Sequence, residues 1–120
     1  MDMKNKELGH QGEEIVEDYL IKKGYLILEN NYLKRVGEID LIVFDPKKEE
    51  LVFVEVKTRR TSTFGYPEEA VTLKKLGKIE KTALNWLKEN GKLDHPWRID
   101  IVALELEKGE KITHFENVTI

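Results

Sequence analysis

Two neighbouring runs of branched and aromatic residues constrain the fold of this chain more than any other feature. They cover residues 37–44 and 51–58 and are separated by six turn-forming residues, 45–50. Branched residues favour strands, and a short polar turn between two such runs predicts an antiparallel hairpin. The chain is therefore expected to build a sheet around this hairpin.

The residues before the hairpin predict one helix and one strand. From 7 to 23, apolar side chains recur at the three-and-four spacing of a helix with one buried stripe, and Gly24 supplies its end. Residues 25–29 suit a short strand, which Asn30 and Asn31 are expected to break or bulge.

The residues after the hairpin predict a second helix and two further strands. A polar loop leads to a helical pattern that is capped by Thr72 and closes at Asn90 and Gly91. Residues 97–106 and 112–118 have the character of strands. The second helix can act as a right-handed crossover between parallel strands, so the order α-β-β-β-α-β-β predicts an α/β fold with a mixed five-stranded sheet flanked by helices.

Length and composition exclude several classes of protein. A chain of 120 residues suits one core, so we expect a single domain over residues 1–120. Without cysteine, any metal must be bound by oxygen or imidazole. No apolar run approaches the ~18 residues of a membrane span, and the first residues lack the apolar core of a signal peptide, which predicts a cytoplasmic protein without a membrane partner. The net charge of −3 argues against a general nucleic-acid coat but allows a local basic patch.

Two acidic residues interrupt strands that otherwise look buried on both faces. If Phe44 lies opposite Leu51 across the turn, Asp40 lies opposite Glu55. Two negative charges ~5 Å apart repel by roughly 3 kcal/mol at an effective dielectric near 20. A hard divalent cation removes this conflict, because carboxylates are the ligands that Mg²⁺ or Mn²⁺ prefers.

Lys57 shares a strand face with Glu55, and the same register places it opposite Glu38. Its amine can orient a water nucleophile or hold a phosphate oxygen. The set Asp40, Glu55 and Lys57 thus describes metal-assisted attack of water on a phosphodiester. Two other interpretations stay open: the acids can be solvent-facing residues of edge strands, and Glu38 with Lys57 can be an ordinary cross-strand ion pair.

Residues 37–42 and 53–59 resemble the paired motifs of the YraN family of small predicted endonucleases. That family is similar in turn to archaeal Holliday junction resolvases and to the wider PD-(D/E)xK nucleases. The resemblance covers nearly the whole chain and extends to residues 9–13, 64–65 and 98–100. It implies a restriction-endonuclease-like core, in agreement with the element order above. Ile39 stands where the superfamily name would put proline, a residue that is often absent there.

The resemblance implies a role for each matching residue. Asp40 and Glu55 correspond to the metal-binding carboxylates, Lys57 to the motif lysine, and Glu13 to an acidic residue from the first helix. The helical wheel supports the last assignment independently, because Glu13 falls beside the buried stripe and Glu14 points away from it. Glu13 can alternatively be an acid favoured by the dipole in the first turn of a helix.

Basic residues that could contact phosphates follow the second motif and line the second helix. Lys74, Lys78 and Lys81 share one helix face. The residues predicted to contact nucleic acid are Arg59, Arg60, Lys74 and Lys78. A solvated, lysine-rich helix face is the competing interpretation.

The sequence therefore predicts a Mg²⁺- or Mn²⁺-dependent endonuclease acting on DNA, with branched or otherwise structured DNA as one candidate substrate. A non-catalytic nucleic-acid-binding or scaffold domain that retains a nuclease fold is the alternative from another class. A ribonuclease, or a nuclease active only inside a larger complex, would use the same residues. Cutting both sides of a junction needs two active sites, which predicts a homodimer.

Overall fold

The structure, a computed structural model, describes residues 2–59 and 72–119 of the chain. Arg60 and the residues at 64–65 that contribute to the resemblance lie outside the described residues. The described helices and strands are α1 (Asp2–Lys22), β1 (Leu26–Lys34), β2 (Gly37–Asp45), β3 (Glu50–Arg59), α2 (Leu73–Glu89), β4 (Trp97–Glu105) and β5 (Lys111–Phe115).

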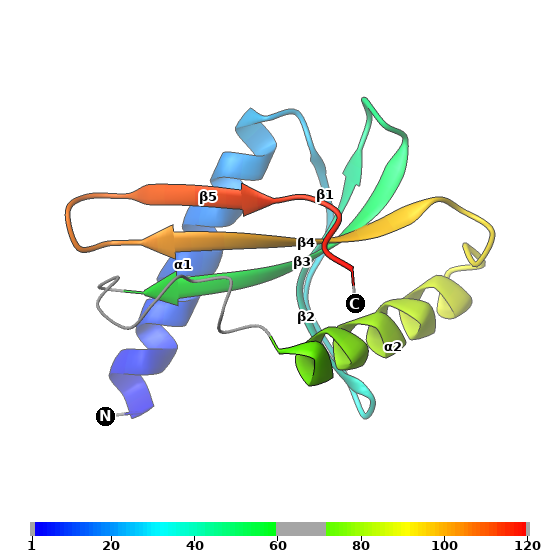
Figure 1. The fold of residues 1–120 in the computed structure, drawn as a ribbon, viewed down its shortest axis with the longest axis horizontal. Coiled ribbons are helices and arrows are strands. Elements are labelled where there is room, and N and C mark those ends of the chain that lie inside the picture. The colour runs from blue at the N-terminus through cyan, green and yellow to red at the C-terminus, as the bar shows by residue number, and fades with distance from the viewer. Residues whose placement is uncertain (1, 60–71, 120) are drawn as a thin grey trace.

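The strands form one five-stranded sheet in the order β1-β2-β3-β4-β5. Only β3 and β4 pair in parallel, and the other neighbouring pairs are antiparallel. The connection between the parallel strands contains α2, as expected for a crossover. In Figure 1, α1 passes behind the strands and α2 lies in front of β2. The mixed sheet flanked by helices is thus confirmed.

The register of the β2–β3 hairpin matches the prediction. Phe44 lies opposite Leu51, and the ladder continues to the pair Leu41 and Val54. Asp40 and Glu55 are the next residues of the two strands, at the point where the pairing of the strands ends. Because β2 and β3 are interior strands, the interpretation of these acids as edge-strand residues is wrong.

The predicted stop of the first helix and both predicted ends of the second helix are confirmed. Gly24 has φ +95°, a left-handed conformation that favours glycine, and the chain turns there into β1. At the start of α2, the Thr72 side chain accepts a hydrogen bond from the backbone N–H of Lys75 at 3.2 Å. Asn90 caps the other end, where its backbone N–H donates to the carbonyl of Trp86 at 3.0 Å.

Three boundaries differ from the sequence expectation by three residues or more. The first helix begins at Asp2 rather than at residue 7, because its polar first turns continue the helix without the apolar spacing that revealed the rest. β1 continues to Lys34 instead of ending at residue 29. Pairing of the buried Tyr32 with Ile39 carries the strand past the asparagines, with a register shift between Ile27 and Glu29.

The last strand is shorter than predicted, since β5 ends at Phe115. Beyond it, Asn117 adopts φ +53°, and the backbone N–H of Val118 donates to the carbonyl of Ile99 at 2.8 Å. The chain therefore leaves the β5 ladder and folds back against the start of β4.

Each face of the sheet carries its own apolar core. On the α2 side, Phe53 packs edge-to-face against Trp86, with ring centroids 5.7 Å apart. On the α1 side, Val16 and Leu20 pack against Val52 and its neighbours. Full burial of one such side chain contributes about 1.5–3 kcal/mol, so the two cores hold both helices on the sheet.

Among the described residues, no helix combines the length and the apolar character that crossing a membrane requires.

Candidate functional site

A cavity of about 350 Å³ opens where the β2–β3 ladder ends. Elements from both sides of the sheet contribute to it. Its charged lining residues are Glu13 from α1, Glu38 and Asp40 from β2, Glu55 and Lys57 from β3, and Lys75 from α2. The four residues predicted to carry the chemistry, at positions 13, 40, 55 and 57, thus meet in one cavity.

Asp40 is a buried carboxyl group with a mixed environment. The residue is 7% exposed, and Oδ2 accepts a hydrogen bond from the backbone N–H of Val56 at 2.7 Å. Burial raises the pKa of Asp40 to about 8, and the hydrogen bond to Glu55 and the charge of Glu55 add to this rise. The Val56 hydrogen bond opposes it. Without a cation, the site therefore favours a proton on Asp40.

Glu55 is buried as well, with 6% exposure. Its Oε2 accepts no hydrogen bond among the described residues. The Nζ of Lys75 lies 3.3 Å from this oxygen, which is an ion-pair distance without hydrogen-bond geometry. A buried carboxylate oxygen without a hydrogen-bond donor is costly, so a donor or a cation at this atom would stabilise it.

Glu13 reaches the cavity because α1 approaches β3 closely at one point. Gly12 provides the approach, since a Cβ at this position would overlap Oγ1 of Thr58. Glu13 is half-buried, whereas Glu14 is exposed, as the helical wheel predicted. Burial raises the pKa of Glu13 against the opposing charge of His10. Since α1 begins at Asp2, Glu13 lies well inside the helix and the first-turn interpretation is wrong.

Lys57 is half-buried at the cavity and makes no hydrogen bond or ion pair with any residue that the structure describes. Glu38 is exposed at the same cavity. No ion pair joins these two described side chains, so the simple cross-strand pair is absent. The amine of Lys57 is therefore free to act on a molecule that enters the cavity.

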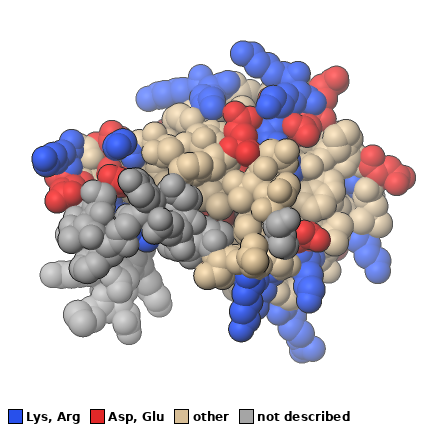
Figure 2. All heavy atoms as spheres, in the orientation of Figure 1, with Lys and Arg blue, Asp and Glu red and all other residues tan. Residues whose placement is uncertain are grey.

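The predicted nucleic-acid contacts lie partly within the described residues. Lys74 and Lys78 are exposed on α2, and Arg59 is half-buried at the end of β3. Arg60 lies outside the described part of the chain. Figure 2 shows Lys and Arg side chains projecting from the edge of the molecule where α2 lies.

The site contains one residue whose place the sequence did not reveal. In the sequence, Lys75 was only one of several lysines of the second helix and was not among those sharing one face, but its side chain lines the cavity and pairs with Glu55. The Thr72 cap places Lys75 in the first turn of α2. This signal locates the residue on its helix, whereas only the packing of α2 on the sheet brings it to Glu55.

The donor set fits a magnesium ion. Among the described residues, no group of three acidic or imidazole side chains forms a complete protein cage for a metal. Mg²⁺ does not require one, because it usually keeps several waters and binds one or two carboxylates. Asp40 and Glu55 supply that pair, Oε2 of Glu55 lacks a hydrogen-bond donor, and the cavity leaves room for water.

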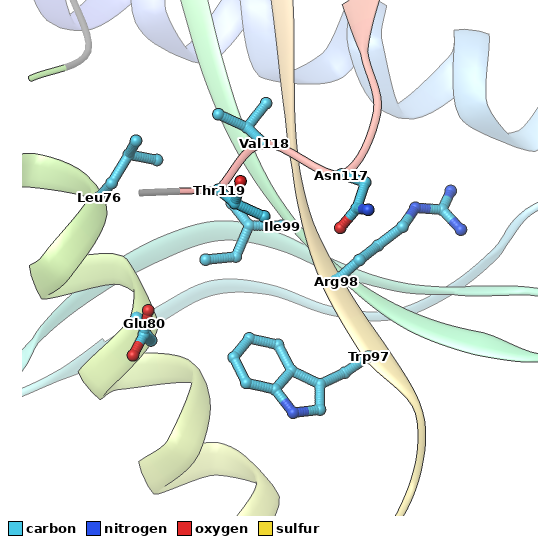
Figure 3. A pocket seen from close by; sticks show the side chains of 8 residues that line it. All are labelled: Leu76, Glu80, Trp97, Arg98, Ile99, Asn117, Val118 and Thr119. Atoms are coloured by element: carbon cyan, nitrogen blue, oxygen red, sulfur yellow. The ribbon is translucent and has the colours of Figure 1, made fainter. Parts of the chain in front are cut away.

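A second cavity, of about 140 Å³, lies between α2, the start of β4 and the C-terminal segment. Figure 3 shows Trp97 turned toward α2 and Arg98 turned to the opposite side of β4. None of the predicted site residues lines this cavity, and much of its lining is apolar, including Leu76, Ile99 and Val118. The chemistry predicted from the sequence belongs to the larger cavity.

The sequence model of the family described as "Uncharacterised protein family UPF0102" matches residues 12–104. The chain belongs to the UPF0102 family. The resemblance to the YraN family is confirmed to this extent, and the relation to nucleases stays a prediction. The matched stretch of this UPF0102 chain contains every charged residue that lines the larger cavity.

UPF0102 proteins similar to this chain occur in several bacteria. One from Syntrophomonas wolfei is 47% identical over 114 residues, which covers 94% of this chain and 97% of the relative. Others from Pelobacter propionicus and Clostridioides difficile are 44% and 41% identical; the matches cover 94% and 96% of this chain, and 82% and 98% of the relatives. These relatives are named only as UPF0102 proteins, so their names indicate no activity for this chain.

Among solved structures, this UPF0102 chain is similar to Pyrococcus furiosus SfsA, determined in complex with Ca²⁺. The two are 20% identical with a TM-score of 0.36, and the match covers 97% of this chain but only 65% of SfsA. We draw no functional conclusion from a likeness of this size.

Proposed function

We propose that this protein is a metal-dependent endonuclease that hydrolyses phosphodiester bonds of DNA. The observation that supports this most is the meeting of Asp40, Glu55 and Lys57 with Glu13 at one cavity. The two buried acids line this cavity together with Lys57, whose amine has no ion-pair or hydrogen-bond partner among the described residues. The arrangement suits hydrolysis at phosphorus assisted by a hard cation.

Each residue has a defined task in this proposal. Asp40 and Glu55 hold Mg²⁺ or Mn²⁺, which when bound neutralises charge on the phosphate and makes water a better nucleophile. Lys57 positions the attacking water or stabilises the charge that develops on the phosphate oxygens. Glu13 assists from α1, either directly or through a hydrogen-bonded water.

DNA is the proposed substrate, and the exposed lysines of α2 are the proposed contacts to its backbone. Lys74 and Lys78 project from the helix whose first turn reaches the cavity. Contacts of this kind position a duplex without reading its sequence. Arg59 and Arg60, at the end of β3 and just beyond it, extend the proposed contact region along the chain.

The decisive assay incubates purified protein with branched, single-stranded and duplex DNA in the presence of Mg²⁺ or Mn²⁺. We expect cleavage of at least one substrate, and a loss of at least about 100-fold in Asp40→Asn and in Lys57→Ala. Glu13→Gln should lose activity, whereas the exposed neighbour variant Glu14→Gln should retain it. If wild type cleaves no substrate faster than Asp40→Asn, the proposal is wrong.

Calorimetric titration with Mg²⁺ separates the nuclease from a non-catalytic domain of the same fold. A nuclease needs to bind the ion, and the Asp40→Asn variant should bind it more weakly. A scaffold has no such need. RNA substrates in the same assay address the ribonuclease alternative, because the residues at phosphorus would be the same.

A homodimer is proposed on the ground that two cuts need two sites. Sedimentation of the wild-type protein at micromolar concentration, with and without branched DNA, should show a mass of two chains. A monomer under both conditions would remove this part of the proposal and leave the hydrolytic site untouched.

A further inference from the structure

Lys75 occupies an unusual position among the lysines of α2. Its Nζ lies 3.3 Å from Oε2 of Glu55, the buried oxygen that accepts no hydrogen bond among the described residues. The side chain of Glu55 is 7% exposed and that of Lys75 is 47% exposed. An ammonium group thus enters from the solvent side and stops at the one buried side-chain oxygen or nitrogen of the described residues that has no hydrogen-bond partner.

The charge of the cavity explains why an ammonium group is held there. Among the described residues that line the cavity, four are acids, at positions 13, 38, 40 and 55, and two are lysines, at positions 57 and 75. Within this set of described residues, the only ion pair joins Lys75 to Glu55. In the absence of a metal, this lysine supplies the nearest positive charge to the buried Glu55 carboxylate.

The contact is also easily broken. The backbone of Lys75 is fixed, because its N–H is capped by Thr72. Its side chain makes no hydrogen bond to another described residue, and half of it is exposed, so solvent screens the pair. Since Oε2 accepts no hydrogen bond from the described part of the chain, removing the ammonium group costs this oxygen no hydrogen bond there.

We infer that Lys75 is a tethered placeholder cation, which holds the Glu55 carboxylate in the metal-free protein and is displaced when a divalent cation binds. The inference rests on the metal site of the proposed function. One oxygen cannot keep both partners at contact distance without bringing their positive charges together. Lys75 therefore competes with the metal while it stabilises the empty site.

The experiment compares Lys75→Ala with a matched control, Lys74→Ala, and with Lys75→Arg. Lys74 lies in the same helical turn and is exposed, and its loss changes the net charge equally. Binding of Mg²⁺ is measured by calorimetry, and thermal unfolding is followed in EDTA and in saturating Mg²⁺. Neither readout depends on DNA cleavage.

Lys75→Ala should bind Mg²⁺ about 2- to 5-fold more tightly than wild type, because the competing cation is gone. Lys74→Ala and Lys75→Arg should bind with wild-type affinity. In EDTA, Lys75→Ala should melt a few degrees below Lys74→Ala, and saturating Mg²⁺ should remove this difference.

Three results would overturn the inference. One is equal binding of Mg²⁺ by Lys75→Ala and Lys74→Ala. Another is a melting temperature of Lys75→Ala that is lowered by the same amount with and without Mg²⁺. In either case Lys75 only forms a structural ion pair with Glu55, and the proposed nuclease function stands. If wild type binds neither Mg²⁺ nor Mn²⁺, the placeholder role and the metal site of the proposed function are both wrong.

Discussion

At the scale of single residues, Asp40 shows how a site can oppose the stability of its own fold. Interior strands place Asp40 beside Glu55, and both acids are buried. Burial and the adjoining acid disfavour the charged form of Asp40, which is the form that binds a cation. The fold tolerates the cost of burying this carboxyl group, although an apolar residue at position 40 would avoid that cost.

The cost of burying the Asp40 carboxylate should appear in the pH dependence of the free energy of unfolding of the metal-free protein. Because the folded pKa is raised from the usual value near 4 to about 8, the free energy of unfolding falls as pH rises through this window. Asp40→Asn cannot ionise and should lack this fall. At pH 9 in EDTA we expect the variant to be more stable than wild type by about 1–3 kcal/mol.

Urea denaturation at pH 5, 7 and 9 measures this effect, with Glu14→Gln as the control for removing an exposed acid. The affinity for Mg²⁺ should rise over the same window, since the ion must displace a proton. Stability curves of wild type and Asp40→Asn that run parallel from pH 5 to 9 would show that Asp40 is ionised throughout.

At the scale of elements, the site depends on how closely α1 approaches β3. The two meet at Gly12 and Thr58, where no side chain fits between them. This contact brings Glu13, the next residue of the helix, to the cavity formed by the β2–β3 hairpin. A helix displaced outward would retain its apolar stripe but lose this acid from the site.

Gly12→Ala should separate α1 from β3. The new methyl group would overlap Oγ1 of Thr58, so we expect a loss of about 1–3 kcal/mol in the free energy of unfolding. Any cleavage activity should fall together with it, because Glu13 moves. The control is Gly77→Ala. An added Cβ there meets no atom within 4 Å outside the neighbouring backbone of its own helix, and alanine should stabilise α2 by up to about 1 kcal/mol.

Combining Gly12→Ala with Thr58→Ala should restore part of the lost stability, since Thr58→Ala removes the oxygen that the new methyl group overlaps. Urea denaturation of the four proteins measures the coupling. Equal stability of Gly12→Ala and wild type would mean that α1 is free to adjust at this contact.

At the scale of the whole molecule, the end of the hairpin opposite the cavity is held by a buried charge network. Arg98 lies 3.0 Å from both Asp45 and Asp100 and 2.8 Å from Glu50. It also donates to the hydroxyl of Tyr25 at 3.0 Å. The network joins β2, β3, β4 and the chain leading into β1. It therefore holds these strands together at the end of the sheet that is remote from the site.

The pKa values of two acids in this network are lowered, whereas the pKa of Asp40 in the site is raised. Burial by itself would raise the pKa of Asp45, but hydrogen bonds from Arg98 and from the turn at residues 47–48 lower it below its usual value. The pKa of Asp100 is also lowered, by hydrogen bonds from His114 and Arg98 against the effect of burial. These carboxylates stabilise the fold above pH 4, and this contribution is lost as pH falls through their folded pKa values.

Arg98→Met should cost about 3–5 kcal/mol at pH 7, because it leaves buried carboxylates without their cation. The variant and wild type should differ less at pH 4, where protonation relieves the unpaired acids of the variant. Lys48→Met is the control, since the exposed pair of Lys48 with Glu116 should be worth less than about 1 kcal/mol. Urea denaturation at the two pH values measures the difference in free energy of unfolding between wild type and Arg98→Met. A difference that increases at pH 4 would contradict the role of Arg98 as the cation of these carboxylates.

Local patterns in the sequence were enough to predict much of this fold. Strand runs and their turn predicted the hairpin and its register, because side chains alternate strictly and one loop length sets the pairing. Helical spacing predicted that Glu13, and not Glu14, faces inward. The acids at positions 40 and 55 were recognisable because charge in a buried strand breaks the pattern around it.

Other features were decided only when distant segments packed together. The path of β1 past Asn31 depends on pairing with β2, and the contact between Lys75 and Glu55 depends on how α2 lies on the sheet. Arg98 gains its partners from several strands and the C-terminal segment. Periodicity reports which face of an element is buried, whereas the identity of the group opposite a side chain is a long-range property that no local pattern contains.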